Sequence, residues 1–460
     1  MRTTDTLPRR WPDRAAVWRW HFYAGLFCIP FVLWLSLTGS VYLFRPQVEA
    51  LIDRPYARVA TAGPRTSPAA QAAAATRAVP GSVLHRFQLP ETATQAVQIV
   101  VGKGGRETRV YVHPHSLGIL KTVDEDQRLM RIVLRLHGEL LAGTPGSYLV
   151  ELAASWTIVM ILTGLFLWWP RGGGLAGVVY PRWRRTGRGF WRDLHGVTGF
   201  WVSAFALIFL LSGLPWAKNW GGYLAAARQI GQPAPVAQDW TTGHAQDVAA
   251  RSAGDAGTRA MLGDHADHLG MTMDHPAGSY APLDALVPRL AELHLPGPVL
   301  IAPPTAHGGA WTAKSDAADR PLRSELTLAP DGAILSRQTF AQRALIDRIV
   351  GYGIALHEGA LFGWINQLVN LVTAMLLMLL SVSSVILWWR RRPADVLGAP
   401  PATLTAPAAW PFVVLLVVLA LFLPLMGGTM LLVLMIERVA LRRIPAAQAW
   451  LGLRAPAGVP

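Results

Sequence analysis

Four long apolar runs constrain this chain more than any other feature of its sequence. They lie near residues 18–45, 147–170, 195–217 and 364–389, and each is long enough as a helix to cross a hydrocarbon core of ~30 Å. Inside a bilayer every backbone polar group needs a partner within the protein, so these runs are expected to be α-helices. The composition, 52% hydrophobic with 19 Trp among 460 residues, also favours an integral membrane protein.

Arginine clusters beside these runs predict which ends of the helices lie in the cytoplasm. The clusters occupy residues 9–19, 182–192 and 390–392, and Lys and Arg gather on the cytoplasmic side of membrane helices. The long segments 46–128 and 218–345 are then expected on the far side. Because much of the net charge of +14 lies at membrane ends, it does not indicate nucleic-acid binding.

A fifth apolar run, 411–436, has two interpretations. Its length suits one more membrane helix, and Pro424, Gly427 and Gly428 interrupt it. A single kinked span would place the arginines at 438–443 on the far side, against the charge pattern. The single kinked span is the favoured prediction, and the hairpin is the alternative.

Each long segment between the helices is expected to form a small α+β module. Residues alternate between apolar and polar, as in paired strands, over 96–101 and 107–112 in the first and over 325–329 and 333–336 in the second. A further strand is expected after the turn that follows residue 112. The Ala- and Pro-rich stretch 59–80 is expected to be a loop.

Two sequence patterns with histidine each occur twice. His21 and His195 both have a glycine four residues later, Gly25 and Gly199, and a hydroxyl-Gly step whose glycine lies 18 residues after the histidine. The second pattern is Leu-His followed 31 residues later by a Trp pair, and it begins at His137 and at His357. These matches predict a tandem duplication with one histidine near either end of each helix pair.

The four histidines suggest cofactor chemistry. Neutral imidazole is a common axial ligand of haem, and two imidazoles per iron in a helix bundle suit electron transfer. The topology pairs His21 with His195 on the cytoplasmic side and His137 with His357 on the far side. Four imidazoles would hold two haems. The alternatives are that these are interfacial polar residues, or duplicated residues kept only because the two halves share ancestry.

The 31-residue spacing poses a geometric difficulty for the outer pair. A straight helix of that length spans about 46 Å, which exceeds the hydrocarbon core. Bends near Gly143 and Gly363 are therefore expected to bring His137 and His357 back towards the bundle. The inner pair does not depend on such a bend.

Several neighbours of the histidines are candidate supporting residues. Gly25 and Gly199 lie one turn deeper than their histidines and would leave room for a flat macrocycle. Other candidates are charged: Arg131 and Arg135 to pair with haem propionates, and Glu139 and Glu358 to orient histidines or relay protons. For the charged residues, ordinary interfacial positions are an equally good interpretation.

A separate His- and Met-rich stretch lies at residues 261–275. Imidazole and thioether ligands together suit copper, particularly Cu(I). The candidate ligands are His265, His268, Met271, Met273 and His275. The alternative is a polar low-complexity insertion without metal.

Seven motifs together resemble the PepSY-associated transmembrane proteins. They are WRWHFYAG (18–25), VYVHPHSLGIL (110–120), LHGELLAGTPG (136–146), LFLWWPR (165–171), DLHGVTG (193–199), LHEGALFG (356–363) and LWWRR (387–391). The resemblance, over about 15–392, implies an iron-regulated inner-membrane protein with PepSY modules in the periplasm. Members include ferric-siderophore reductases with four-helix cores and two b-type haems.

The resulting prediction is a mainly α membrane protein with a four-helix transmembrane core from a tandem duplication. It also has two periplasmic α+β PepSY-like modules and a C-terminal membrane helix. The expected segments are 1–45, 46–128 (first module), 129–170, 171–194 (basic cytoplasmic loop), 195–217, 218–345 (second module), 346–390 and 391–460.

The expected function is a di-haem reductase of the bacterial inner membrane. It would take electrons from quinol or a cytoplasmic reductant and pass them to a periplasmic ferric siderophore, whose iron is then released. No nicotinamide- or phosphate-binding motif is present in the sequence to supply electrons from within the chain. The alternatives are a copper-linked reductase using 261–275 and a haem-free sensor or assembly protein.

Overall fold

The computed structural model describes residues 14–170, 174–230, 280–304, 309–400 and 410–453. The chain divides into two compact units. The first consists of residues 1–41, 135–236 and 368–460, and the second of residues 42–134 and 237–367.

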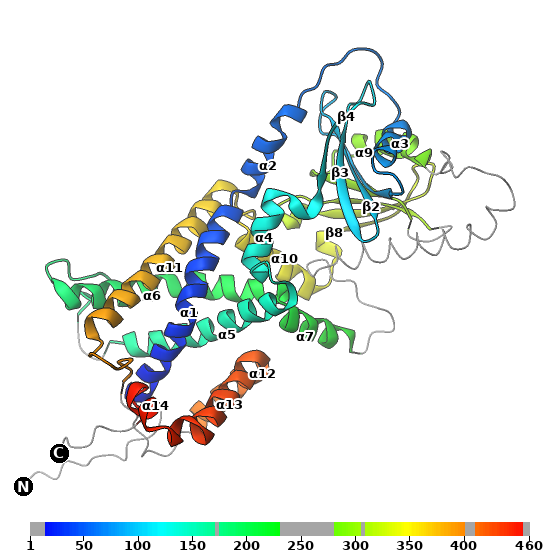
Figure 1. Cartoon of the computed structure of the whole chain (residues 1–460). Helices are drawn as coiled ribbons and strands as arrows, with labels where there is room; N and C mark the ends of the chain where they lie inside the picture. Colours follow the sequence, from blue (N-terminus) through cyan, green and yellow to red (C-terminus); the bar gives the residue numbers. More distant parts are fainter. Residues whose placement is uncertain (1–13, 171–173, 231–279, 305–308, 401–409, 454–460) are drawn as a thin grey trace, which may run out of the picture. The chain divides into compact units, whose positions relative to one another are not determined.

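Four long helices form the main part of the first unit (Figure 1). They are α1 (Arg14–Tyr42), α5 (Gly143–Trp168), α6 (Gly187–Gly213) and α11 (Gly363–Arg391). All four are long and apolar enough to cross a membrane. The prediction that these four apolar runs form long helices is therefore confirmed.

Helices α1 and α5 pack antiparallel with a regular spacing. The Arg14 guanidinium donates to the carbonyl of Leu167 at 2.7 Å, and the Cys28 thiol faces the carbonyl of Ala153 at 3.7 Å. His21 lies midway between Arg14 and Cys28, seven residues from each. Seven residues are close to two helical turns, so all three side chains project from one face of α1 towards α5.

The other contacts close a ring of four helices. α5 packs along α6. Gly199 of α6 lies against Leu380 of α11. The guanidinium of Arg391, at the end of α11, stacks over the Trp18 ring of α1 at 4.7 Å. Each helix therefore contacts two of the others, as in a four-helix bundle.

The helix is interrupted directly after each Leu-His motif. α4 (Leu129–Glu139) ends two residues after His137, and α10 (Leu345–His357) ends at His357 itself. Gly143 and Gly363, which begin the next helices, have left-handed φ values of 61° and 58°, a conformation that favours glycine. The bends expected near these glycines are present, so the 31 residues do not form one straight helix.

A buried carboxylate inside α5 caps a neighbouring helix. Glu151 is 2% exposed and accepts hydrogen bonds from the backbone N–H groups of Asn219 at 2.9 Å and Trp220 at 3.2 Å. These groups lie in the first turn of α7 (Lys218–Gln229), where N–H groups lack partners within the helix. The position of this charge in an apolar helix is thus explained by capping.

The C-terminal apolar run forms two helices that fold back on each other. α12 (Trp410–Phe422) and α13 (Pro424–Val439) are separated by Leu423 alone. Ala420 and Gly427 would lie about 10.5 Å apart along one continuous helix. A Cβ built on Gly427 would instead lie 2.8 Å from the Ala420 Cβ. The favoured prediction of a single kinked span is therefore wrong, and the hairpin describes this segment.

Both ends of this hairpin return to the same end of α1. The backbone N–H of Leu397, before the hairpin, donates to the carbonyl of Trp450 at 3.0 Å, at the end of α14 (Pro445–Trp450). Arg19 of α1 donates to the carbonyls of Pro400 at 2.7 Å and Gly452 at 2.9 Å. The prolyl break at Pro424 thus reverses the chain, and the arginines at 438–443 do not lie across the membrane from those at 390–392.

This arrangement predicts the labelling pattern of the C-terminal segment. Single cysteines replacing Ala394 and Ala446, in a Cys28→Ala background, should both react with a membrane-impermeant maleimide from the same side in sealed vesicles. Cys28 is buried, so its replacement leaves the surface unchanged. Labelling of the two positions from opposite sides would contradict the hairpin and restore the single span.

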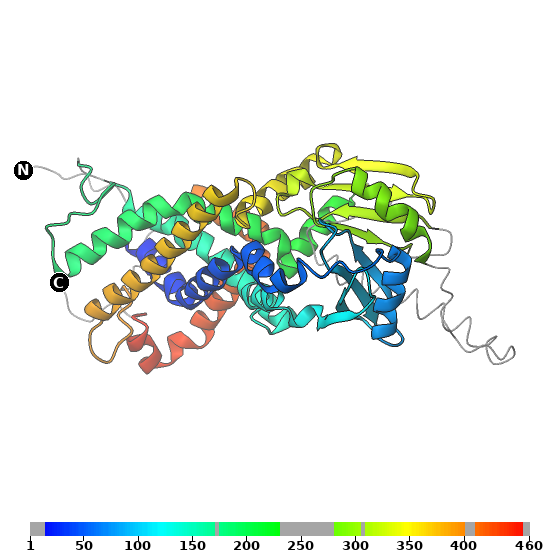
Figure 2. The same ribbon diagram turned by 90° about the horizontal axis from the view of Figure 1, so that it is seen from above.

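The second unit contains an eight-stranded antiparallel sheet (Figures 1 and 2). Its strands in chain order are β1 (Val83–Gln88), β2 (Val97–Lys103), β3 (Arg106–Val112), β4 (Ile119–Asp124), β5 (Val299–Ala302), β6 (Trp311–Ser315), β7 (Ser324–Leu328) and β8 (Ile334–Thr339). The order across the sheet is β4-β3-β2-β1-β5-β6-β7-β8.

The two predicted modules share this sheet, and they are not separate. β1 pairs antiparallel with β5 through Phe87 opposite Ile301, and both side chains are fully buried. The helices α3 (Pro68–Ala78) and α9 (Pro282–Glu292) contact each other and share one hydrophobic core with the sheet. The prediction of a loop over 59–80 is wrong for the part that forms α3.

One close contact between neighbouring strands depends on a glycine. His85 lies where the register of β1 shifts against β2, and its buried ring lies over Gly102. A Cβ built on Gly102 would lie 2.0 Å from the His85 Nε2. The His85 Nδ1 meets the Glu107 carboxylate at 2.8 Å, and Arg86 binds the same carboxylate. Only glycine at position 102 leaves space for this imidazole.

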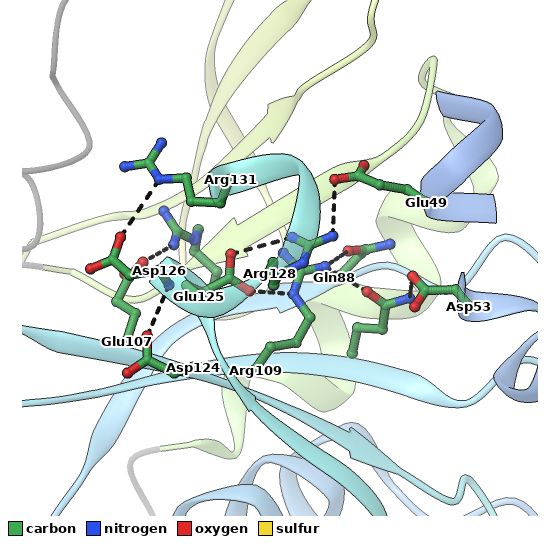
Figure 3. Close-up of polar contacts among 12 residues, drawn as sticks. Glu49, Asp53, Gln88, Glu107, Arg109, Asp124, Glu125, Asp126, Arg128 and Arg131 are labelled. Carbon is green, nitrogen blue, oxygen red and sulfur yellow. Dashed lines mark hydrogen bonds and ion pairs between the residues drawn. The ribbon is translucent and has the colours of Figure 1, made fainter. Parts of the chain in front are cut away.

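A network of charged residues joins α2 (Arg45–Asp53) to the first half of the sheet (Figure 3). Glu125 binds Arg109 of β3 and Arg128, and Arg128 also reaches Glu49 of α2 at 3.2 Å. Burial alone would raise the pKa of Glu125. The two guanidinium groups outweigh burial and hold this pKa below its ordinary value. The carboxylate therefore stays charged and keeps α2 attached at neutral pH.

Candidate functional site

His21 lies inside the helix bundle with one ring nitrogen anchored to α5. Its Nδ1 is 3.0 Å from the carbonyl oxygen of Met160 and 3.1 Å from the Thr163 hydroxyl. The ring passes close to Gly164, where an added Cβ would lie 3.0 Å from the His21 Cε1. The small residue thus permits the ring to lie against α5.

These contacts determine the tautomer of His21. A backbone carbonyl can only accept a hydrogen bond, so the Nδ1 of His21 carries the proton and donates to Met160. In a neutral imidazole the other nitrogen, Nε2, then has a free lone pair. This is the form in which histidine binds a metal through Nε2.

His195 repeats this geometry between α6 and α11. Its Nδ1 is 3.2 Å from the carbonyl oxygen of Leu380 and 3.2 Å from the Ser383 hydroxyl. The same argument places the proton on Nδ1 and the lone pair on Nε2. His21 and His195 thus lie in the same unit, and both rings are half-buried.

His137 has a similar contact with α1. Its Nδ1 is 3.1 Å from the hydroxyl of Thr38, which donates to the Trp34 carbonyl at 2.8 Å. The hydroxyl of Thr38 is thus within hydrogen-bond distance of both the Trp34 carbonyl and the His137 ring. A Cβ built on Gly39 would lie 3.2 Å from the ring. Thr38-Gly39 is one of the two hydroxyl-Gly steps in the sequence, and in the structure the His137 ring lies against it.

His357, the fourth predicted ligand, belongs to the second unit. It is the last residue of α10 and is half-buried. The Asn366 side-chain amide donates to the carbonyl of the preceding Leu356 at 3.0 Å and so holds the end of this helix against the start of α11. The pairing of His137 with His357 remains a prediction.

The predicted supporting glycines lie at helix contacts. Gly25 faces the Met160 side chain, whose Sδ would be 3.8 Å from an added Cβ, and Gly199 faces Leu380. These are the two residues whose carbonyls hold the histidines. Both glycines therefore allow their helices to approach the acceptor helix, and contact with a macrocycle remains a prediction.

The predicted supporting charges have protein partners. Arg135 donates to Glu139 at 2.8 Å, and Arg131 lies 3.6 Å from Asp126 (Figure 3). Glu358 acts on Arg45. Burial alone would lower the pKa of Arg45, but Tyr42 and nearby carboxylates, among them Glu358, outweigh burial and raise this pKa. Roles for Arg131, Arg135, Glu139 and Glu358 at a cofactor remain predictions.

The candidate copper ligands His265, His268, Met271, Met273 and His275 lie outside the described residues. Within the described ranges, no group of three or more His, Cys, Asp or Glu side chains is placed to hold a metal ion. The copper hypothesis therefore depends on residues 261–275 alone.

The sequence reasoning missed the residues that anchor the inner histidines. Thr163 and Ser383 each lie five residues before a Trp pair and three residues after the residue that supplies the carbonyl. These equal positions in the two LWW motifs were a signal in the sequence. Whether they face a histidine depends on helix packing, which spacing alone does not determine.

Within the described residues, the segment Pro424–Arg443 joins the four long helices as a fifth helix that is long and apolar enough to cross a bilayer, so the chain is a multi-pass membrane protein. A family model for the PepSY-associated TM region matches residues 18–391, and the chain belongs to this family. The predicted resemblance is thereby confirmed over most of the sequence. A search of curated proteins finds no match to the chain. The hairpin of α12 and α13 lies beyond the matched residues.

Proposed function

We propose that this protein is a di-haem reductase of the bacterial inner membrane that delivers electrons to a periplasmic ferric siderophore. His21 and His195 would ligate one haem b, and His137 and His357 the other. When bound by two imidazoles, haem supplies one-electron transfer. The halves of the sheet would be the PepSY modules of a tandem duplication and lie on the periplasmic side.

The observation that carries this proposal is the shared tautomer of His21 and His195. Both rings donate through Nδ1 to a backbone carbonyl, which leaves both Nε2 atoms with a lone pair for iron. A histidine that serves only as a polar residue at the membrane interface does not need its tautomer to be fixed. Two imidazoles held this way in the same unit would supply the axial ligand set of a b-type haem.

The residues around the rings also fit a haem. Gly164 and Gly39 leave space for the imidazoles of His21 and His137 against their helices. The basic residues at 182–192 and 390–392 support a cytoplasmic position for the inner pair. Electrons would enter there from membrane quinol or from a soluble cytoplasmic reductant.

Reduction would release iron from the acceptor. Hard oxygen donors of a siderophore hold Fe(III) well and Fe(II) less well, so one electron delivered to the complex weakens it. The chain's own contribution is to hold the imidazoles and to exclude water around them with the apolar faces of the four helices. Haem potentials in proteins depend on ligands, burial and hydrogen bonds of this kind.

The first test is spectroscopic. The purified full-length protein should contain two haems per chain and give a reduced-minus-oxidised spectrum with b-type bands. The reduced protein should become oxidised again when a ferric hydroxamate or catecholate siderophore is added. Protein that is folded and haem-free would leave the sensor or assembly interpretation in place of the reductase.

A further inference from the structure

We infer that Thr163 and Ser383 are positioning residues that orient the imidazoles of His21 and His195 and increase the electron density on their Nε2 atoms. This inference rests on the proposed function, because it assigns the hydroxyl groups a role towards the inner haem. Both hydroxyls contact the histidines from helices other than those that carry the ligands.

The hydroxyl groups can act only as acceptors towards the rings. The Thr163 hydroxyl donates to the Val159 carbonyl at 2.8 Å, and the Ser383 hydroxyl donates to the Leu380 carbonyl at 2.9 Å. Each hydroxyl has one proton, so its lone pairs face the histidine. The Nδ1–H of each ring is therefore shared between a carbonyl and a hydroxyl.

Two acceptors on one N–H have an orienting effect. The carbonyl and the hydroxyl lie three residues apart on the partner helix, which places them one above the other on the same face. A ring held between two such oxygens is restricted in its rotation about χ2. The direction of its Nε2 lone pair is then fixed before a haem enters the bundle, which is the ordinary role of hydrogen bonds behind a metal ligand.

The same contacts have an electronic effect. A hydrogen bond from Nδ1–H to an oxygen gives the imidazole partial anionic character, which makes Nε2 a stronger donor to iron. A stronger donor favours Fe(III) over Fe(II) and lowers the reduction potential of the haem. Loss of one acceptor should therefore raise the potential of the inner haem.

The arrangement occurs twice although the surroundings differ. Thr163 is followed by Gly164, which makes room for the His21 ring. Ser383 is followed by Ser384, whose hydroxyl donates to the Ser381 carbonyl at 2.7 Å. The hydroxyl next to the histidine is thus present in both halves, while the adjacent residue is not the same. The contact between hydroxyl and histidine therefore does not depend on which residue follows the hydroxyl residue.

The test is a redox titration of the purified full-length protein. Thr163→Val keeps the size of the side chain and removes the acceptor, and Ser383→Ala removes the acceptor on α11 without replacing the oxygen atom. Each should raise the inner-haem potential by the equivalent of about a tenfold change in the oxidised-to-reduced ratio, which is ~59 mV for one electron. Thr163→Ser, which retains the hydroxyl, should restore the original value.

Matched controls come from the same helices. The hydroxyls of Thr157 and Ser381 donate to carbonyls of their own helices, and Thr157→Val and Ser381→Ala should leave the potential unchanged. Equal potentials in the Thr163→Val, Ser383→Ala and control proteins, with both haems bound, would overturn the inference alone. Absence of haem from the wild-type protein would instead overturn the proposed function.

Should Thr163→Val fail to accumulate, Ser383→Ala and Thr163→Ser still decide the matter. A raised potential in Ser383→Ala together with an unchanged one in Thr163→Ser supports the inference. An unchanged potential in Ser383→Ala contradicts it. The second measurement is the haem spectrum at low temperature, where a less restricted imidazole broadens the α band of the same haem.

Discussion

Replacing His21 by alanine should remove one of the two haems and leave the other. About half of the b-type absorbance should disappear, because a bis-imidazole site that loses one ligand no longer holds its iron as a low-spin electron carrier. His195→Ala should give the same spectrum, and the double variant should lose no more than either single variant. The measurement is the haem-to-protein ratio of purified protein together with the reduced-minus-oxidised spectrum.

Variants of the other histidines complete this experiment. His137→Ala and His357→Ala should also each lose half of the absorbance, and combining either with His21→Ala should remove all of it. His294 is exposed and serves as the control, since His294→Ala should retain both haems. A pairing of His21 with His137 would be revealed if their double variant kept half of the absorbance, and this result would sink the proposed inner and outer pairs.

Replacing Gly102 by alanine should destabilise the sheet by about 3 kcal/mol, the upper end of the usual cost of overpacking. The new Cβ would lie 2.0 Å from the buried His85 ring. That ring is held at its far side by Glu107, so it cannot move away without breaking the bond. The measurement is the thermal unfolding of the full-length protein in detergent, followed by the near-ultraviolet signal of Trp311 and the other aromatic residues.

The double variant Gly102→Ala/His85→Ala distinguishes this clash from a general effect of alanine in the strand. Removing the ring should recover most of the loss, because the two changes act on one contact. Gly222→Ala is the control: an added Cβ there meets nothing within 4 Å, and glycine in a helix costs stability relative to alanine. A loss in Gly222→Ala as large as in Gly102→Ala would show that the measurement does not report on the contact.

The sequence predicted the helices of the first unit well because a bilayer leaves an apolar run little choice of structure. It also predicted the strands around the turn at Lys103 and Arg106, where alternation and glycine coincide. The helix α3 was missed although Ser67 and Pro68 are ordinary start signals for a helix. Its Ala-rich composition is typical of a low-complexity loop, but Ala is also the strongest helix former.

Other features depended on contacts between distant residues. The pairing of Phe87 with Ile301 joins strands more than two hundred residues apart in the chain, and no local pattern indicates it. The reversal at Pro424 likewise depends on contacts such as the close approach of Ala420 and Gly427. The histidines could be found from their repeated spacing, whereas the carbonyl of Met160 that sets the tautomer has no sequence signature, because every residue has a carbonyl.

The seam between β1 and β5 also bears on how the protein is made. Residues 143–213, which contain α5 and α6, are synthesised after β1 and before β5. The edge of β1 therefore stays unpaired while the two apolar helices are synthesised and enter the membrane. An unpaired strand edge can pair with other chains. The edge of β1 is covered only when the ribosome has completed the chain as far as Ala302, the end of β5. A chain that terminates before that point would keep this edge exposed and would be prone to aggregation.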